Sequence, residues 1–427
     1  MAAVVAVSAW ALYESVLGLM QLSGYRVSGH ARFAMTGSFD NPGPYGGVLA
    51  ILLAVLVSFI VLNRKDSSVI SRVVRIIALV ASALCVIVLP ATFSRAAWLS
   101  FAVAMLVLGF KELGLRGWIA GHRRLSAVLV VFAVLAGIGI FCLKADSAIG
   151  RLHIWHMELR AIAEEPLTGH GPGTVLGIYG REQAEYFAEK ERPDIIVKVA
   201  GCPEYAFNEY LRVGVEYGLP VMFALLALLC AVIVLLLKKH SPFAYGLIAF
   251  AVFAFFSYPL SLFKINGEAE EEWESVRHLV GMELYEEAVD ALAPLYGGLS
   301  GNYRYLYDYG YALHKTGKYE ESIDILQKGV AISSDPMFHN IIGKNNEALG
   351  LYEEARKHYI HAHYMVPCRI YPLSLLMQMH MKLGQDEEAL ELGRKILDMP
   401  VNEKHRTMLQ LRQETAAAVD SLMTERK

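Results

Sequence analysis

Apolar runs of membrane-spanning length recur through the first 263 residues and restrict the chain to folds that satisfy their backbone groups inside a bilayer. We expect about seven transmembrane helices, because a helix needs about 20 apolar residues to cross the hydrocarbon core. With 55% hydrophobic residues, the chain is too apolar for an ordinary soluble protein of 427 residues. The predicted spans are 2–22, 43–62, 73–91, 96–110, 125–143, 219–237 and 243–263.

Basic residues in the short loops predict the orientation, because they stay preferentially on the cytoplasmic side of a membrane. The three basic clusters all fall on one side of an alternating path through the spans. They are Arg64, Lys65 and Arg72; Lys111, Arg116, Arg123 and Arg124; and Lys238 and Lys239. The opposite, extracytoplasmic side should then hold the long loop 144–218 and everything after the last span.

The composition changes near 264–268, from apolar to polar and rich in Glu, Lys and Tyr. This change predicts a transmembrane domain over 1–264, containing the large loop 144–218, followed by a soluble domain. The net charge of −3 comes without a basic stripe, so nucleic acid is not an expected partner. Five cysteines form no CxxC pair, and their pattern predicts neither a disulfide framework nor a zinc site.

A seven-residue pattern recurs after the last span, with spacings of 34, 33 and 34 residues between 282–288, 316–322, 349–355 and 383–389. This is the period of tetratricopeptide repeats, which are helix-turn-helix units. Pro367 and Pro400 interrupt the chain between units. We therefore expect an all-α fold: a polytopic helix bundle, then a tetratricopeptide-like α-solenoid over 269–403 and a helical tail over 404–427. Such arrays usually present a concave protein-binding face, but four units can also brace the membrane domain.

Polar residues gather at the extracytoplasmic ends of the spans and in the long loop. Glu14 is the main ionisable residue inside a predicted span, and this scarcity argues against an ion-coupled transporter. Four polar segments stand out. They are Thr-Gly-Ser-Phe-Asp-Asn-Pro at 36–42; Thr-Phe-Ser-Arg-Ala-Ala-Trp at 92–98; Arg-Leu-His-Ile-Trp at 151–155 with Pro-Leu-Thr-Gly-His-Gly-Pro-Gly at 166–173; and Ala-Phe-Asn-Glu-Tyr-Leu at 206–211 with Glu-Tyr-Gly-Leu at 216–219.

In this order, the four segments resemble the O-antigen ligase and polymerase family of membrane glycosyltransferases, over about residues 30 to 260. The resemblance implies transfer of a glycan from an undecaprenyl-diphosphate carrier to a glycan or lipid acceptor. It also implies that the reaction takes place at the outer face of the bacterial cytoplasmic membrane, without a metal, cofactor or nucleotide sugar.

The resemblance also implies that Arg95 and Arg151 bind the carrier diphosphate, for which the planar guanidinium fork is well suited. The plainer interpretations are that Arg95 snorkels to the membrane interface and that Arg151 is a solvated loop charge. Asn41 and Asn208 are further candidates for substrate binding, Asn208 by contact with acceptor hydroxyls.

One departure from the family concerns the catalytic base. The family carries a His-Asn pair whose histidine is the proposed base for the acceptor, and this chain has Phe207-Asn208. The role could pass to Glu204 or Glu209, whose pKa could rise in a closed site, or to one of three histidines, His153, His156 or His170. His170 lies in the glycine-rich turn 169–173, where the backbone can approach a ligand closely.

The sequence also leaves room for a metal site and for a function without catalysis. His153 and His156 are spaced for a metal, but no third ligand is evident. Because the usual base is absent, the chain could instead be a non-catalytic, membrane-anchored repeat scaffold of a surface-polysaccharide assembly system, with a protein partner on its repeats.

Ligases and polymerases differ only in the acceptor, which no named residue identifies. Family members usually have more spans before the Thr-Gly-Ser-Phe segment, so the sequence leaves open whether residue 1 is the natural start.

Overall fold

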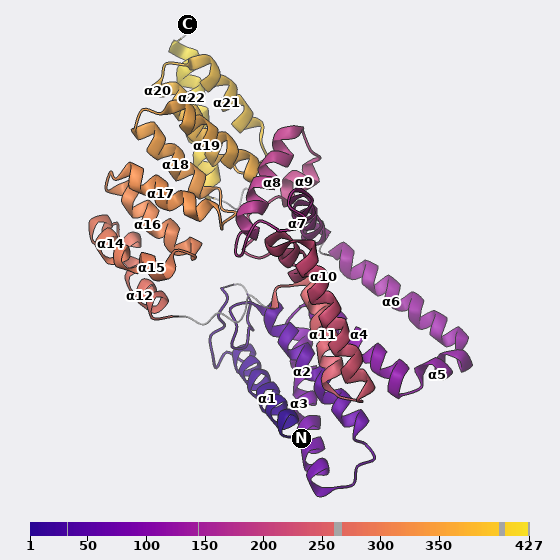
Figure 1. Ribbon diagram of the computed structural model, residues 1–427. Coiled ribbons are helices and arrows are strands. Elements are labelled where there is room, and N and C mark those ends of the chain that lie inside the picture. Colours follow the sequence, from indigo (N-terminus) through magenta and orange to yellow (C-terminus); the bar gives the residue numbers. More distant parts are fainter. Residues whose placement is uncertain (32, 144, 260–266, 401–405, 426–427) are drawn as a thin grey trace. The chain divides into compact units, whose positions relative to one another are not determined.

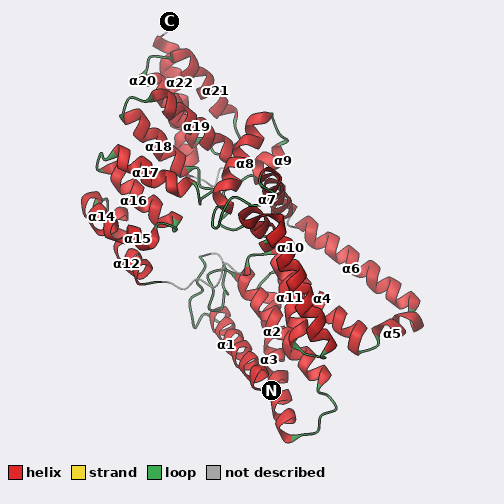
Figure 2. Ribbon diagram, viewed as in Figure 1, coloured by secondary structure: helices red, strands yellow, loops and turns green. Residues whose placement is uncertain are grey.

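The computed structural model describes residues 1–31, 33–143, 145–259, 267–400 and 406–425, and every regular element in these ranges is a helix (Figures 1 and 2). The predicted all-α fold class is confirmed. The chain forms two compact units. The first unit comprises Met1–Lys144, Ala206–Gly214 and Leu219–Lys264, and the second comprises Ala145–Tyr205, Val215–Gly218 and Ile265–Lys427. The predicted domain boundary at 264–268 lies largely outside the described residues.

The first unit holds the apolar helices. Among the described residues, four helices are long and apolar enough to cross a membrane, α1, α2, α3 and α10, or up to five if α4 and α5, bent by 86°, form one span. The predicted total of about seven spans stays a prediction. The helices are α1 (Ala2–Leu22), α2 (Pro42–Leu62), α3 (Val69–Ala91), α4 (Arg95–Glu112), α5 (Leu115–Gly121), α6 (Arg123–Leu143), most of α10 (Glu209–Lys238) and α11 (Phe243–Phe256).

Helix α2 forms the centre of the first unit and packs against α1, α3, α4 and α11. Most of its side chains are buried, among them Leu49, Leu53 and Leu56, which are fully enclosed. Its sequence is apolar on all sides, as expected of a helix with neighbours all round. The central position of α2 fixes the place of the Thr-Gly-Ser segment that leads into it.

Two polar side chains of α1 hold the loop before α2. The Gln21 amide oxygen accepts hydrogen bonds from the backbone N–H groups of Thr36 (2.9 Å) and Gly37 (2.8 Å), and its nitrogen donates to the Gly37 carbonyl (2.8 Å). The Glu14 carboxylate accepts from the Ser38 hydroxyl (2.6 Å) and backbone N–H (3.1 Å). Glu14 is the main ionisable residue inside a predicted span. Its carboxylate therefore finds hydrogen-bond donors in the loop before α2.

Replacing Gln21 tests this support. In Gln21→Ala, three buried backbone groups of Thr36 and Gly37 lose their partner, so we expect a loss of roughly 1–3 kcal/mol of stability. The measurement is the thermal unfolding midpoint of the detergent-purified protein. Met20→Ala is the matched control, because the neighbouring Met20 side chain is 41% exposed. A Gln21→Ala midpoint no lower than that of the control would contradict the assignment.

The second unit contains helices of the predicted loop together with the repeat region. The loop helices are α7 (Ala145–Glu164), α8 (Val175–Glu189) and α9 (Asp194–Val199). The following helices are α12 (Glu268–Val276), α13 (His278–Gly281), α14 (Tyr285–Leu292), η2 (Ala293–Leu295), α15 (Tyr296–Leu299), α16 (Tyr303–Lys315), α17 (Tyr319–Val330), α18 (Met337–Ala348), α19 (Tyr352–Met365), α20 (Tyr371–Lys382), α21 (Asp386–Asp398) and α22 (Arg406–Glu425).

The recurring sequence pattern lies at the same place in successive helix pairs. The pairs α16–α17, α18–α19 and α20–α21 pack side by side, and the glycine between the two helices of each pair has a positive φ, between 68° and 78°. The small residue that ends each pattern has no exposed surface, which lets the two helices approach closely. These small residues are Ala288, Ser322, Ala355 and Ala389. The tetratricopeptide classification itself stays a prediction.

Helix α8 packs closely against the repeat helices. A Cβ atom on Gly177 would lie 2.2 Å from the Ala331 carbonyl oxygen, and one on Gly180 would lie 3.3 Å from the Cα of Ser334. The Gln183 side-chain amide donates to the Met365 carbonyl, at the end of α19. The repeats therefore brace a helix of the loop that precedes α10.

A buried histidine cluster joins α18 and α19. The Nδ1 atoms of His339 and His358 are 2.9 Å apart, and the His361 ring centroid lies 4.4 Å from that of His339. Burial is the main cause that lowers the pKa of all three, to about 4 for His361. Nearby, burial also lowers the pKa of His363 to about 4.

These shifts predict acid sensitivity of the two helices. Because the folded-state pKa lies below that of the unfolded chain, the unfolded state takes up more protons, and stability present above about pH 6.5 is lost as the pH falls toward 4. Hydrogen exchange of residues 337–365 should accelerate between pH 7 and pH 5, after correction for the intrinsic rate. His361→Gln should reduce this acceleration, and the exposed His278→Gln should not. An acceleration unchanged in His361→Gln would refute the prediction.

Candidate functional site

The N-terminal ends of three helices of the first unit gather beside the C-terminal half of α11. The Ser94 hydroxyl, at the start of α4, donates to the Gly43 carbonyl in the first turn of α2 (3.3 Å). The Tyr210 hydroxyl, in the first turn of α10, donates to the Ala251 carbonyl of α11 (2.8 Å). A Cβ atom on Gly47 would lie 2.2 Å from the Phe253 ring, so α2 touches α11 through a glycine.

This arrangement favours an anion. Helix N-termini present backbone N–H donors and a partial positive charge, and they are common binding sites for phosphate groups. The half-buried Arg95 is the first residue of α4 and adds a full positive charge there. Ser94 makes no side-chain cap to this helix. The first turn of α4 therefore combines N–H groups without a side-chain cap with a guanidinium, which suits a phosphate.

Asn41 and Asn208 cap the other two helices. The Asn41 side-chain oxygen accepts from the Gly43 N–H (2.9 Å), and that of Asn208 accepts from the N–H groups of Tyr210 (3.0 Å) and Leu211 (3.1 Å). Sequence reasoning missed this capping role, although an Asn followed by Pro42 at the first helical position is a typical helix start. A role of either side chain in substrate binding stays a prediction.

Glu209 and Phe207 stand on either side of Asn208. Glu209 is the first residue of α10, is only 3% exposed, and its carboxylate lies 2.6 Å from the Arg212 Nε. Phe207 has a positive φ of 55°, and its ring makes an edge contact with Tyr258 at 5.4 Å. The resemblance predicts a histidine at position 207, and the structure has an aromatic packing contact there, with a buried carboxylate two residues further on.

In the second unit, two of the polar segments bind each other through their backbones. The His170 N–H donates to the Val215 carbonyl (2.8 Å), and the Gly171 N–H donates to the Glu216 carbonyl (3.0 Å). Gly169 and Gly218 have positive φ values of 67° and 82°. A Cβ atom on Gly169 would lie 2.5 Å from the Glu216 carbonyl carbon, and one on Gly218 would lie 2.4 Å from the Leu167 oxygen. Both positions therefore require glycine.

The candidate histidines have different surroundings. The His170 Nε2 lies 2.9 Å from the Ala161 carbonyl, so it carries the proton and donates, which leaves Nδ1 as the nitrogen that can accept a proton. His153 is buried, its Nε2 is 2.8 Å from the Gln183 amide oxygen, and burial lowers its pKa. The His156 ring packs edge-on against Tyr186. Of the three, His170 therefore has the clearest acceptor nitrogen.

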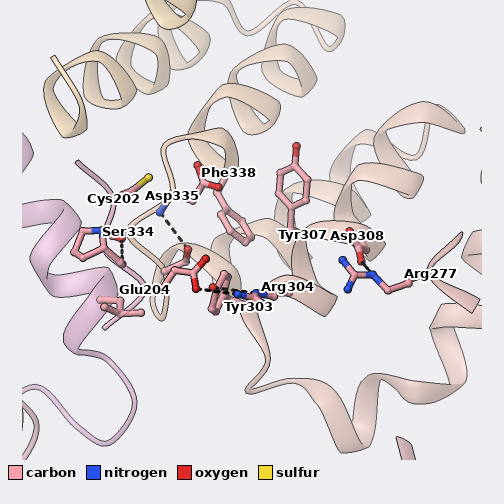
Figure 3. A pocket seen from close by; sticks show the side chains of 13 residues that line it. Cys202, Glu204, Arg277, Tyr303, Arg304, Tyr307, Asp308, Ser334, Asp335 and Phe338 are labelled. Carbon is pink, nitrogen blue, oxygen red and sulfur yellow. Dashed lines mark hydrogen bonds and ion pairs between the residues drawn. The ribbon is translucent and has the colours of Figure 1, made fainter. Parts of the chain in front are cut away.

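Arg151 and Glu204 belong to the second unit, whereas Arg95 and Glu209 belong to the first. Arg151 is half-buried on α7. Glu204 pairs with Arg304 of α16, with a distance of 3.0 Å between the two side chains, and it lines a cavity of about 350 Å³ within the second unit (Figure 3). Sequence reasoning missed this ion pair, because no signal in one sequence joins residues that are 100 positions apart.

Three carboxylates of α7 and α8 approach one another closely enough to hold a metal ion, those of Glu164, Glu182 and Glu185. Arg181 lies among them, 2.9 Å from Glu182 and 3.9 Å from Glu185, and also pairs with Glu164. Arg160 adds a second contact to Glu182 at 3.3 Å. These ion pairs account for the cluster without a metal, so it remains a structural network between the two helices.

A family model described as O-Antigen ligase matches residues 80–226. None of the curated proteins compared with the chain matches it. The matched range contains the start of α4 with Arg95, the helix with Arg151 and both backbone-bonded segments, and it ends before the repeats. The match supports the O-antigen ligase and polymerase family, and with it a membrane glycosyltransferase of the multi-pass type found in bacterial inner membranes.

Gly218 provides a test of the contact between the two segments. In Gly218→Ala, the new methyl group would collide with the Leu167 carbonyl, and alanine would be strained at the positive φ of this position. We therefore expect the free energy of unfolding to fall by at least about 1–3 kcal/mol. The measurement is the rate of limited proteolysis between 165 and 218. Gly201→Ala is the matched control, because a Cβ atom there meets nothing within 4 Å. Equal rates in the two variants would show that the close contact does not stabilise this region.

Proposed function

We propose that the chain is a membrane glycosyltransferase that moves a glycan from an undecaprenyl-diphosphate carrier to an acceptor at the extracytoplasmic face. The observation that carries the proposal is Arg95 at the start of α4, within the range that matches the O-antigen ligase family. The first turn of α4 supports it, because its backbone N–H groups have no side-chain cap, whereas Asn41 and Asn208 cap α2 and α10.

In the proposed reaction, the bond between the first sugar carbon and the diphosphate oxygen breaks, and a bond to an acceptor hydroxyl oxygen forms. The diphosphate leaves with both electrons of the broken bond. A fixed guanidinium stabilises this developing negative charge, which lowers the barrier without a metal or cofactor. We assign this role to Arg95 from its position in the first unit, and to Arg151 from the family resemblance.

The acceptor hydroxyl must lose its proton as the new bond forms, and Glu209 is our first candidate for the base. It is buried and lies at the same gathering of helix ends as Arg95, both within the first unit. Its partner Arg212, 2.6 Å away, would hold the carboxylate in one orientation. His170, through its Nδ1, is the second candidate. Glu204 is the third, although its exposure and its pair with Arg304 indicate a binding role.

A non-catalytic scaffold is the second candidate function, and one observation favours it. Phe207 fills the position of the family base and packs against Tyr258, so this chain lacks the usual group for activating an acceptor. In that case the membrane helices would mainly anchor the repeats. The two functions differ in one respect that can be measured, which is whether transfer depends on Arg95.

The test uses cells that lack this chain and are complemented with variants. We expect Arg95→Ala, and separately Arg151→Ala, to reduce the amount of long or attached glycan by about 100-fold or more, because removal of one charge-stabilising donor typically costs that much. Arg95→Lys should recover part of the activity, since the charge remains and the bidentate geometry is lost. The measurement is the glycan profile, with protein level and membrane insertion checked for each variant.

Arg72→Ala is the control, because Arg72 is an exposed arginine of α3 outside the matched range. Full complementation by both Arg95→Ala and Arg151→Ala would refute the diphosphate assignment and favour the scaffold function.

A further inference from the structure

A cavity of about 350 Å³ lies within the second unit, between the chain segment that precedes α10 and the repeat helices (Figure 3). One wall is formed by Cys202, Pro203 and Glu204, and the opposite wall by α16 and the loop into α18. The Ser334 hydroxyl donates to the Pro203 carbonyl (2.8 Å), and Arg304 pairs with Glu204 (3.0 Å). Its volume lies in the range of about 300–1,000 Å³ that is common for small-molecule sites.

The charged side chains of this cavity are paired with one another or with a neighbour. Glu204 pairs with Arg304 at 3.0 Å, and Arg277 lies 3.7 Å from Asp308. Asp335 lies 3.8 Å from Arg369, just outside the cavity. Three carboxylates and two guanidiniums line the space, so it offers no net positive charge to an anion. A paired carboxylate still has lone pairs to accept a hydrogen bond, and a paired guanidinium still has N–H groups to donate one.

Aromatic rings complete the lining. Tyr303, Tyr307 and Phe338 contribute side chains, and Tyr307 and Phe338 are in edge contact with their centroids 5.4 Å apart. Burial raises the pKa of the Tyr307 phenol, so its hydroxyl stays protonated and can donate a hydrogen bond. Aromatic faces beside neutralised charge pairs suit a ligand with both apolar C–H faces and many hydroxyl groups.

We propose that this cavity binds one neutral, hydroxyl-rich sugar residue of a glycan. The choice of a sugar among small polar ligands rests on the proposed function, whereas the preference for a neutral ligand follows from the paired charges. An extended peptide is a poorer fit, because the 202–204 segment already covers the repeat helices at this place. Glu204 lies three residues before Phe207, so an occupied cavity would touch the chain immediately before the Phe-Asn-Glu segment.

The test is saturation-transfer NMR on the full chain in lipid nanodiscs, free of glycoside detergents. The probes are glucose, galactose, mannose, rhamnose and N-acetylglucosamine, with glucuronate and an uncharged hexapeptide for comparison. We expect transfer to the ring protons of at least one neutral sugar, and at least fivefold weaker binding of it in Tyr307→Leu and in Asp335→Asn. The Asp335 carboxylate accepts a hydrogen bond from the Met337 N–H (3.0 Å), and the Asp335→Asn side chain keeps an oxygen that can accept it, so folding should be preserved.

Tyr352→Leu and Asp324→Asn are matched controls, because both residues are exposed on repeat helices outside the cavity and should leave binding unchanged. Absence of transfer to every neutral sugar would overturn the proposal. Sugar binding that is unchanged in Tyr307→Leu and Asp335→Asn would also overturn it. A third contradicting result would be that glucuronate or the peptide binds more tightly than the neutral sugars and that the two substitutions weaken this binding. The assay contains no carrier lipid, and Arg95→Ala should bind sugar as the wild type does. Failure of sugar binding is therefore distinguishable from failure of the transferase function.

Discussion

Backbone packing between the turn around Gly169 and the segment ending at Gly218 holds two of the polar segments of the second unit together. Two N–H groups of the turn donate to the carbonyls of residues 215 and 216, and at both glycines the closest atoms are backbone atoms of the facing segment. The same residues interrupt α10, whose only described non-helical backbone conformation is at Gly218. A contact between main chains leaves little room for adjustment, since backbone atoms cannot change rotamer as side chains do. It thus explains physically why two segments far apart in the sequence both carry glycine.

Local sequence signals predicted the apolar helices and the repeat helices well, but they did not predict α7, α8 and α9 in the loop 144–218, and they predicted the partners of side chains poorly. Apolar runs and the spacing near 34 residues depend only on neighbours along the chain, so the helices and the positive-φ turns at Gly317, Gly350 and Gly384 follow from them. The Gln21 and Glu14 contacts with the loop before α2 depend on how α1 packs in three dimensions. The ion pair of Glu204 with Arg304 likewise joins distant segments, which periodicity cannot detect. The role of Asn41 as the N-cap of α2 was predictable, because an Asn before Pro is a typical helix start. Sequence reasoning instead interpreted Asn41 as a substrate-binding residue.

The candidate site combines two kinds of positive charge. The N-terminus of α4 provides a partial charge that is fixed by the fold, and Arg95 provides a full charge at the same place. In the proposed reaction, both charges would act on a phosphate of the leaving group. In the proposed mechanism the base is Glu209, a carboxylate on the first turn of α10, two residues after the position at which the family resemblance places a histidine. A change of base from an imidazole to a carboxylate would move the proton acceptor from the loop onto the helix itself.

The glycines of α8 have a consequence for how chains of this kind can be recombined. Gly177 and Gly180 let α8 lie directly against the backbone at residues 331 and 334. The surface between this loop helix and the repeat region therefore has almost no space for a side chain at these two positions. A repeat array taken from another protein would present a different backbone path at this surface. The repeats therefore cannot be exchanged as an independent module, and a working chimaera would have to carry α8 and its array together.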